Sequence, residues 1–243
     1  EQCLQPQRFA DYCPNGLQVE GRAKVVRLAT GVTACQQFVD AAIAWGADAL
    51  LVHHGYFWRG EAPQVTGMKR RRLAALLAND VSLLAYHMPL DAHPQLGNNA
   101  CLGRLMGFDT ADQLPLQPAT VGGLGNIGYL PAAIPAREFV ARVAKITARS
   151  PLHVGDPDVM VRSIAWCTGA AQDYITAAVT VGADLFVTGE ASEQTVHIAR
   201  EEGIGFIAAG HHATERYGVQ AVGEDLAARF GLQHRFFDID NPV

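Results

Sequence analysis

Short apolar runs alternate with longer amphipathic segments along most of this chain. Leu50, Leu51 and Val52 form one such run, and Gly55 marks the turn that follows it. A short run that is apolar on both faces predicts a strand covered on both sides, as in a parallel sheet. Strands of this kind that alternate with amphipathic helices predict an α/β fold with right-handed crossover connections.

The first half of the chain contains a pattern that the second half repeats. Residues 25–55 predict a strand, a turn, an amphipathic helix and a second strand, and residues 161–190 predict the same order. The two segments align at an offset of about 136 residues, which places the Gly-Ala-Asp of 46–48 on that of 182–184. Both predicted helices end at a glycine, the residue that most readily caps a helix C-terminus.

The repeat continues downstream of both segments. Residues 72–91 and residues 195–215 each predict a helix, a turn and a strand that ends in ionisable residues. Each half is therefore expected to form a β-α-β-α-β unit, and the chain to form two similar α/β/α lobes by internal duplication.

The two predicted lobes comprise residues 1–112 and 113–243. The second begins with a stretch rich in Gly and Pro, residues 113–135, that predicts a linker of loops and short strands. Residues 136–150 predict an exposed amphipathic helix. The C-terminal tail contains one more strand, whose partner the pattern does not identify, so packing on the first lobe stays open.

Composition argues against several classes of protein. The chain has 243 residues, of which 49% are hydrophobic and 18% charged, and a formal net charge of −5. These are the proportions of an ordinary globular protein, and a net acidic chain argues against a nucleic-acid surface, which normally shows clustered Lys and Arg. The basic run from Lys69 to Arg72 leads into an apolar segment and predicts the solvated start of a helix.

Cysteine usage and hydropathy bear on the compartment. The five cysteines are odd in number, widely spread and without a C-x-x-C pair, which is typical of reduced thiols in a cytosolic protein. No run approaches the roughly 18 apolar residues of a membrane span, and no secretory segment opens the chain. We therefore expect a cytoplasmic protein without a membrane partner. Glu1 is not an initiator methionine, so the natural start is expected upstream.

Ionisable side chains gather where the predicted strands end, and six of the nine histidines belong to this group. The group consists of His53, His54, His87, Asp91, His93, Glu190, His211, His212 and Glu215. Ligands of α/β sheets bind beyond the carboxyl ends of the strands. Imidazole and carboxylate without thiolate suit a divalent first-row metal, so the pattern predicts a metal site.

The adjacent pair His53 and His54 indicates more than one ion. Neighbouring residues of a strand point to opposite faces, so the two imidazoles cannot easily share one metal if the strand continues through them. At a strand end they can serve two ions that lie next to each other. Such a pair of ions, bridged by a carboxylate and a water, lowers the pKa of that water and can stabilise a hydrolytic transition state.

Some of these side chains have alternative interpretations. His87 and His93 can be hydrogen-bonded surface histidines, and Glu190 can cap the helix that follows it. His212 is expected to be the solvent-facing neighbour of His211. The location of the histidine pairs at strand ends in both halves is what favours a metal site over scattered surface polarity.

Two further segments bear on ligand binding. The aromatic residues 56–58 predict a pocket wall, an interface anchor or local core packing. The glycine-rich stretch 122–128 lacks the G-x-G-x-x-G register and the Walker lysine, so it does not predict a phosphate loop. Nucleotide recognition therefore has no motif of its own in this sequence.

Several motifs follow one another from about residue 11 onward, namely "DYCPNGLQVEG", "GADALLVHHGYFWRGE", "YHMPLDAHPQLGNNA", "VTGEASEQTVH" and "GHHATERYG". Together they resemble the bacterial dinuclear-metal family of GTP cyclohydrolase type 2 homologues, the NGG-interacting-factor-like or YbgI-type proteins. The resemblance runs to the end of the chain.

The resemblance implies two metal ions and a set of five ligands. These ligands are His53, His54, Asp91, His211 and Glu215. The metal can be Fe, Mn, Zn or Ni, because this ligand set accepts all four. The resemblance also implies two intertwined lobes and a ring-shaped homohexamer whose metal sites face a central cavity.

Three functions are consistent with such a site. The first is metal-dependent hydrolysis of a nucleotide or similar small molecule, with GTP cyclohydrolase activity suggested by the resemblance. The others are a regulatory or scaffold ring with a structural metal centre, and a protein that stores or delivers metal. Open coordination positions favour hydrolysis, because structural sites tend to be closed. The candidate acids and bases are Glu190 and His87, which directly follow strands, and then His93.

Overall fold

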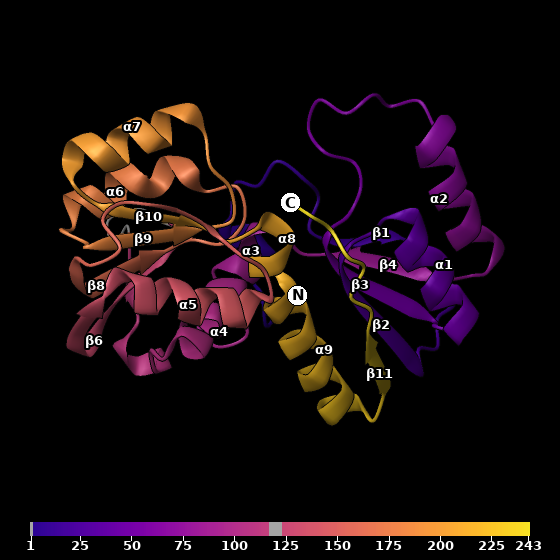
Figure 1. Ribbon diagram of the computed structural model, residues 1–243. Helices are drawn as coiled ribbons and strands as arrows, with labels where there is room; N and C mark the ends of the chain where they lie inside the picture. Colours follow the sequence, from indigo (N-terminus) through magenta and orange to yellow (C-terminus); the bar gives the residue numbers. More distant parts are fainter. Residues whose placement is uncertain (1, 117–122) are drawn as a thin grey trace. The chain divides into compact units, whose positions relative to one another are not determined.

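The computed structural model describes residues 2–116 and 123–243 and shows an α/β protein, as the sequence predicts (Figure 1). The chain forms two compact units. Unit 1 consists of Glu1–Leu90 and Gly218–Asp240, and unit 2 of Asp91–Tyr217 and Asn241–Val243. The chain passes between the units at residues 91, 218 and 241. The two lobes predicted on either side of residue 112 stay a prediction.

Unit 1 is built on a five-stranded sheet in the order β1-β4-β3-β2-β11. All neighbouring strands are parallel except β1 and β4. The strands are β1 (Gly16–Val19), β2 (Arg27–Thr33), β3 (Ala49–His54), β4 (Ser82–Ala85) and β11 (Gln233–Phe236). The central strand β3 is buried from residue 49 to residue 53, which confirms the strand predicted from the apolar run.

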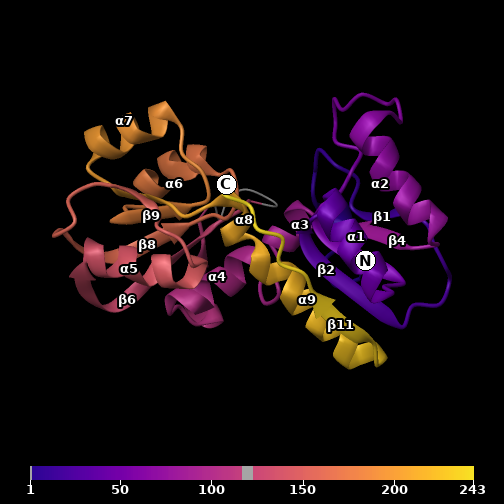
Figure 2. The same cartoon turned by 45° about the vertical axis from the view of Figure 1, so that its right-hand side comes forward.

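Helices cover both faces of this sheet (Figures 1 and 2). They are α1 (Gln36–Trp45), α2 (Gly67–Ala78) and α9 (Arg216–Phe230). Phe38 of α1 lies against Gly31 of β2, where an added Cβ would be 2.8 Å from the ring. Gly223 of α9 lies against His234, whose ring is 2.8 Å from Thr30 Oγ1. Because Thr30 and Gly31 are adjacent on one strand, α1 and α9 cover opposite faces.

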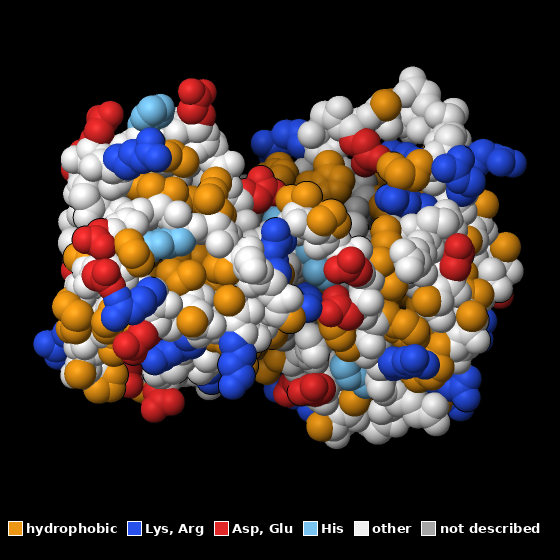
Figure 3. All heavy atoms as spheres, viewed as in Figure 1, with side chains coloured by type: hydrophobic (Ala, Val, Ile, Leu, Met, Phe, Trp, Pro, Cys, Tyr) orange, Lys and Arg blue, Asp and Glu red, His pale blue; other side chains and the backbone are white. Residues whose placement is uncertain are grey.

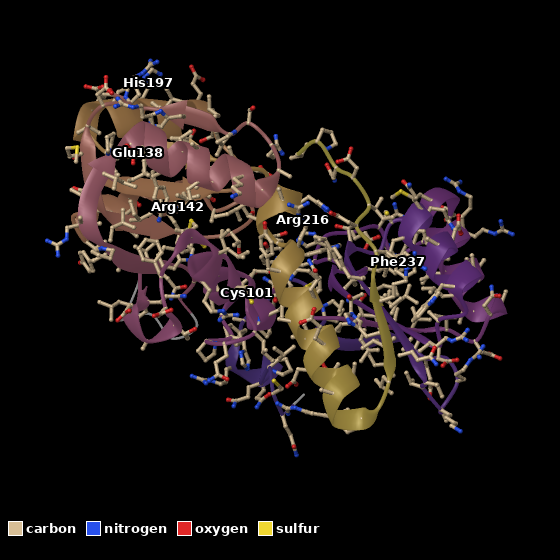
Figure 4. The ribbon with its side chains drawn as sticks, turned by 60° about the horizontal axis from the view of Figure 1, so that its bottom comes forward. Cys101, Glu138, Arg142, His197, Arg216 and Phe237 are labelled. Carbon is tan, nitrogen blue, oxygen red and sulfur yellow. The ribbon has the colours of Figure 1, made fainter. Side chains whose placement is uncertain are left out.

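The C-terminal tail completes the core of unit 1. β11 pairs in parallel with β2, which gives the last strand its partner. Phe237 follows β11 (Figure 4) and packs edge-on against Phe38 and Trp45 of α1, with ring centroids 6.1 and 6.0 Å apart. The guanidinium of Arg235 lies 4.6 Å from the Phe237 ring centre. Such contacts between rings and with a cation add to the burial of the tail.

Unit 2 is built on a six-stranded sheet in the order β5-β6-β8-β9-β10-β7. Strands β8, β9 and β10 are parallel, and the others are antiparallel to their neighbours. The strands are β5 (Leu114–Pro115), β6 (Asn126–Pro135), β7 (Leu152–Val154), β8 (Met160–Trp166), β9 (Leu185–Thr188) and β10 (Gly205–Ala208). Residues 117–122 of the predicted linker 113–135 lie outside the described residues. The later part of that stretch is more than a linker, because β6 is a ten-residue strand of this sheet.

Helices cover both faces of the second sheet as well (Figures 1 and 2). Along β8, Ile164 and Trp166 pack into a core with α4 and α5, whereas Ala165 and Cys167 pack into another core with α6 and α7. This alternation is that of a strand buried on both faces. The helices are α4 (Asn98–Met106), α5 (Ala136–Thr147), α6 (Ile175–Thr180) and α7 (Glu193–Glu202). Helix α5 confirms the amphipathic helix predicted after residue 135.

Short helical turns complete the described part of the chain. They are η1 (Pro6–Arg8), α3 (Met88–Asp91), η2 (Thr110–Asp112), η3 (Gln172–Tyr174) and α8 (His211–Thr214). Both α3 and α8 directly follow the ends of parallel strands, β4 and β10, and both carry predicted metal ligands.

Both units contain the expected β-α-β-α-β segment, β2-α1-β3-α2-β4 in unit 1 and β8-α6-β9-α7-β10 in unit 2. The aspartates of the two Gly-Ala-Asp motifs make matching contacts. Asp48 Oδ2 accepts the backbone N–H groups of Val26 and Arg27 at 2.8 and 2.9 Å, and Asp184 Oδ2 accepts two N–H groups of β8 at 2.8 Å each. The shared topology and contacts support an internal duplication, which stays a prediction.

The surface is mixed in charge. Figure 3 shows acidic and basic side chains interspersed on the visible face of each unit. The basic run from Lys69 to Arg72 lies in α2, as predicted, and Lys69 Nζ is 3.3 Å from a carboxylate oxygen of Glu61. Among the described residues, no helix has the length and apolarity that a membrane crossing requires.

The contacts of Asp48 predict how much this side chain stabilises the fold. Burial would raise the pKa of Asp48, but the N–H groups of Arg27 and Val26 and the Arg22 guanidinium lower it below 3.8. Asp48→Ala should therefore reduce the free energy of unfolding by about 2–3 kcal/mol, because these donors lose a charged acceptor. The contribution should be present above about pH 4 and lost only as the pH falls through the lowered pKa.

Urea unfolding followed by circular dichroism measures this loss. Asp48→Asn keeps one acceptor oxygen and should cost less than Asp48→Ala. Asp40 is exposed on α1, so Asp40→Ala should change the stability by less than about 0.5 kcal/mol. Equal stability of Asp48→Ala and Asp40→Ala would contradict the assigned role.

Candidate metal centre

Three histidines of unit 1 gather where β3 and β4 end. His53 and His54 are the last two residues of β3, and His87 follows β4. The ring centre of His53 lies 4.5 Å from that of His54 and 5.0 Å from that of His87. One ring nitrogen of each histidine lies within 4.8 Å of the other two, a spacing that could hold a metal ion.

The Nδ1 atoms of the adjacent pair are engaged by the surrounding strands. His53 Nδ1 lies 2.9 Å from the backbone oxygen of Tyr86, and His54 Nδ1 lies 3.2 Å from Thr33 Oγ1. A carbonyl oxygen only accepts, so the neutral His53 ring carries its proton on Nδ1 and a lone pair on Nε2. A partner on one ring nitrogen is the usual way in which proteins orient a histidine that binds metal through the other.

A carboxylate holds His87 in the same way. His87 Nδ1 lies 2.9 Å from Asp11 Oδ1, and Asp11 also accepts the N–H of Met88 at 2.9 Å and the amide of Asn15 at 3.0 Å. Burial would raise the pKa of Asp11, but these hydrogen bonds hold it well below 3.8. The hydrogen bond with His87 lowers it most. Asp11 is therefore an ionised carboxylate that fixes the His87 ring.

In unit 2, His211 lies between two glutamates at the start of α8. Its Nδ1 is 2.6 Å from Glu190 Oε1 and its Nε2 is 3.2 Å from Glu215 Oε2. Burial lowers the pKa of His211, but Glu215 and then Glu190 outweigh this effect and raise it to about 9. Without metal, His211 is therefore a cation at neutral pH, and its Nε2 proton occupies the position where a metal would bind.

Three glycines at the ends of strands make room for these side chains. Gly169, Gly189 and Gly210 follow β8, β9 and β10, and consecutive N–H···O bonds of 2.9 Å join them beyond the strands. A Cβ on Gly169 would overlap Glu215 Oε1 and lie 3.3 Å from His211 Nε2. A Cβ on Gly189 would lie 2.7 Å from the Cα of His211. The arrangement of His211 and Glu215 therefore requires glycine, which has no Cβ, at positions 169 and 189.

Asp91 is buried beside the end of β8. Its Oδ1 accepts hydrogen bonds from Asn98 Nδ2 at 2.8 Å and from Thr168 Oγ1 at 3.3 Å. Burial raises the pKa of the Cys167 thiol well above 9.0, and the charges of Asp91 and Glu215 add to the rise. Both carboxylates therefore lie near the residues that follow β8. The three predicted ligands of unit 2, namely Asp91, His211 and Glu215, gather there.

His93 is engaged with the backbone. Its Nδ1 accepts the N–H groups of Gln95 and Leu96 at 3.2 and 3.0 Å, which fixes the turn after α3. Together with Asp91 it also lines a cavity of about 230 Å³ within unit 2. His93 therefore has a structural role in this turn and shares a cavity with Asp91, a predicted metal ligand. Its assignment as an acid or base stays a prediction.

Two residues of unit 2 differ from the sequence interpretation. His212 is buried, with only 9% of its surface exposed, so the expectation that it faces solvent is wrong. The end of the chain lies against it, because the N–H of His212 donates to the Val243 oxygen at 3.0 Å. Glu190 does not cap α7, whose N-cap is Ser192, and instead bonds to the ring of His211.

Sequence reasoning missed the residues that orient the ligands. Asp11 is separated from His87 by 76 positions, and Thr168 is separated from Asp91 by 77 positions. Neither periodicity nor motif spacing signals such pairs. The polar segment 11–15 stood out only as part of the family resemblance.

Comparison with known proteins now identifies the family. The sequence pattern of the family Duf34/NIF3 (NGG1p interacting factor 3) matches residues 1–242. The chain belongs to the Duf34/NIF3 family. This membership confirms the resemblance seen in the motifs.

Relatives in this family cover nearly the whole chain. The "GTP cyclohydrolase 1 type 2 homolog" of Pseudomonas aeruginosa is 55% identical over 240 residues, which are 99% of this chain and 94% of that protein. The protein of the same name from Escherichia coli K12 is 50% identical over 238 residues, 97% of this chain and 93% of that protein.

Solved structures of the Duf34/NIF3 fold agree closely with this one. The structure titled "protein ybgI, unknown function" superposes with a TM-score of 0.92 at 46% identity and covers 100% of this chain and 96% of that one. TTHA1606 from Thermus thermophilus superposes with a TM-score of 0.87 at 35% identity over the same shares.

The glycines of unit 2 lead to a test with a matched control. Gly169→Ala should lower the bound metal, because the new Cβ displaces the Glu215 carboxylate. Gly182 has nearly the same φ, +70° against +72°, and among the described atoms nothing lies within 4 Å of an added Cβ. Gly182→Ala should therefore cost the same strain, roughly 1–2 kcal/mol, and keep its metal.

Metal content by inductively coupled plasma mass spectrometry, together with urea unfolding, separates the two effects. Equal metal content in Gly169→Ala and Gly182→Ala would remove Glu215 from the ligand set.

The raised pKa of His211 predicts a pH dependence of metal binding. Below about pH 9 the ring must lose a proton to bind an ion. The apparent affinity of the metal-free protein for Mn²⁺ should therefore rise by about tenfold per pH unit up to that value and then level off. Glu190→Gln removes one of the charges that raise the pKa, so the affinity should level off at a lower pH.

Isothermal titration calorimetry between pH 6.5 and 9.5 measures this dependence. An affinity that does not change between pH 7 and pH 9 would show that His211 does not bind the ion.

Proposed function

We propose that this Duf34/NIF3 protein binds two divalent metal ions per chain and hydrolyses a nucleotide or a similar small molecule. The ligands are His53, His54, Asp91, His211 and Glu215. The proposal rests on one observation, that each histidine of this set has its Nδ1 engaged by a fixed partner, so that Nε2 is the ring nitrogen that a metal would use, in His211 after loss of its proton. Histidines are oriented in this way to bind metal.

The donor set accepts Fe, Mn, Zn or Ni. Thiolate ligands are not expected, because the buried thiols of Cys13 and Cys167 have raised pKa values. Burial, together with the charge of Asp11, raises the pKa of Cys13 to about 12, and burial raises the pKa of Cys167 well above 9.0. When bound, divalent ions lower the pKa of coordinated water and stabilise the charge of a hydrolytic transition state.

His87 is the group that this chain offers for moving a proton. Its Nδ1 is held by the ionised Asp11, so Nε2 is the atom that can take or give a proton. A carboxylate that orients a histidine is the arrangement used by many hydrolases. Glu190 is bound to His211, which supports a role in orienting that ligand more than a role in proton transfer.

The name of these relatives, "GTP cyclohydrolase 1 type 2 homolog", makes GTP the first substrate to test. The proposal includes the ring-shaped homohexamer that the family resemblance implies. A regulatory or scaffold ring and a metal-handling protein remain the alternatives, and the activity assay decides among them.

The test measures metal and turnover on the same samples. Protein loaded with Mn²⁺, Fe²⁺, Zn²⁺ or Ni²⁺ is analysed for metal and assayed against GTP and a panel of phosphate esters. We expect two ions per chain and hydrolysis that rises with pH through neutral values. His87→Ala should keep its metal and lose about 100-fold or more in turnover. His197 is exposed on α7 (Figure 4), so His197→Ala should keep both.

Two results would contradict the proposal in different ways. Full occupancy of both ions in a His53→Ala, Glu215→Ala double variant would remove the ligand assignment. Fully loaded protein that hydrolyses nothing in the panel would make the scaffold or metal-handling alternative the better one.

A further inference from the structure

Two aromatic side chains stand beside the histidines of unit 1. The rings of Tyr12 and Trp58 meet His87 edge-on, with ring centres 5.0 and 5.1 Å from its own. Trp58 also lies 6.0 Å from the ring of His54, and the two aromatic rings are 5.6 Å apart at an angle of 38°. Tyr12 and Trp58 therefore form one aromatic surface, the Tyr12–Trp58 shelf, directly beside the histidine cluster.

Local core packing does not explain this shelf. Tyr12 keeps 51% of its surface exposed, whereas core aromatics such as Trp166 and Phe38 are fully buried. A large, half-exposed aromatic ring next to a polar cluster is typical of a surface that a ligand covers. About half of the Tyr12 surface thus faces solvent.

The backbone beside Trp58 is strained. Phe57 has a φ of +66°, a conformation that a bulky side chain rarely adopts. Phe57 is 38% exposed, and the Lys69 ammonium lies 5.1 Å from its ring centre. The turn thus leaves Phe57 at the surface and brings Trp58 against the histidines. Strain of this kind persists mainly where the surrounding structure uses it for a function.

Hydrogen bonds tie the two loops of the shelf together. The N–H of Arg59 donates to the backbone oxygen of Tyr12 at 2.7 Å, and Arg59 Nη2 donates to the backbone oxygen of Asp11 at 3.2 Å. The Trp58 Nε1–H donates to the Gly55 oxygen at 3.2 Å, which fixes the indole. The protein's own hydrogen bonds therefore hold the shelf in place, and the exposed side chain of Arg59 lies at its side.

We propose that the Tyr12–Trp58 shelf binds the planar nitrogen heterocycle of a phosphorylated substrate, and that Arg59 binds the phosphate. This inference rests on the proposed function, whose substrate class it specifies. Aromatic side chains stack on heterocyclic bases with little regard to their identity, and a guanidinium adds a planar cation that matches phosphate. A ring on the shelf would lie next to His54 and His87.

Binding to metal-free protein tests the inference independently of hydrolysis. The protein is freed of metal with a chelator and titrated with GMP, guanosine and ribose 5-phosphate by calorimetry, with tryptophan fluorescence as a local signal. GMP should bind and quench Trp58, and ribose 5-phosphate should bind at least about tenfold more weakly, because stacking is lost. If GMP binds but the metal-loaded protein hydrolyses nothing, the binding role of the shelf stands and only the hydrolase assignment is removed.

Substitutions separate the ring from the rest of the site. Tyr12→Leu should weaken GMP binding by about fivefold to 100-fold, whereas Tyr12→Phe keeps the ring and should stay within about threefold. Tyr129 on β6 is 53% exposed in unit 2, so Tyr129→Leu is the matched control and should not change binding. Arg59→Ala should weaken binding of GMP but not of guanosine.

Circular dichroism confirms that each variant is folded before titration. Trp58→Leu provides a second test by calorimetry and should resemble Tyr12→Leu. The inference is overturned if GMP does not bind at millimolar concentration, if Tyr12→Leu binds it as well as Tyr129→Leu does, or if Tyr12→Phe loses as much as Tyr12→Leu. Equal loss of GMP and guanosine in Arg59→Ala would remove the phosphate assignment.

Discussion

A histidine inside a protein can offer one nitrogen to a metal only if its other nitrogen has found a partner there. In this chain four histidines at or after the ends of β3, β4 and β10 meet that requirement. A carbonyl, a hydroxyl and two carboxylates engage the Nδ1 atoms of four histidines. Each partner must be placed by backbone that is itself fixed. Tyr86 and Thr33 are placed by strands β4 and β2, and Asp11 is held by the Met88 N–H and the Asn15 amide.

The parts of the fold that follow local rules could be predicted from the sequence. Strand β3 was evident because its side chains are apolar on both faces, and α5 because its apolar residues recur at helical spacing. The two Gly-Ala-Asp motifs marked equivalent turns, and Asp48 and Asp184 indeed make matching bonds. The group of ionisable residues at strand ends was evident for a related reason, since strand ends in α/β sheets place polar residues at one edge. The choice of five ligands within that group came from the family resemblance.

What the sequence did not predict depends on contacts between distant segments. The pairing of Asp11 with His87 has no local signature, and neither has the burial of His212 under the last residues of the chain. The stretch 113–135 looked like a linker because it is rich in Gly and Pro, yet β6 pairs with β8. The positive φ of Phe57 could not be foreseen, because a bulky residue rarely adopts it and the next residues, Trp58 and Arg59, are held by distant and local backbone oxygens.

The path of the chain has a consequence for how the protein is made. β11 pairs with β2, and Arg27 bonds to Gln233 across 206 positions. On the ribosome, the sheet of unit 1 must wait with an open edge at β2 until unit 2 has been synthesised. Long-range pairing of this kind is slow and leaves strand edges exposed. In the described part of the chain, the strands of unit 2 lie between residues 114 and 208. The sheet of unit 2 can therefore form before the sheet of unit 1 is complete.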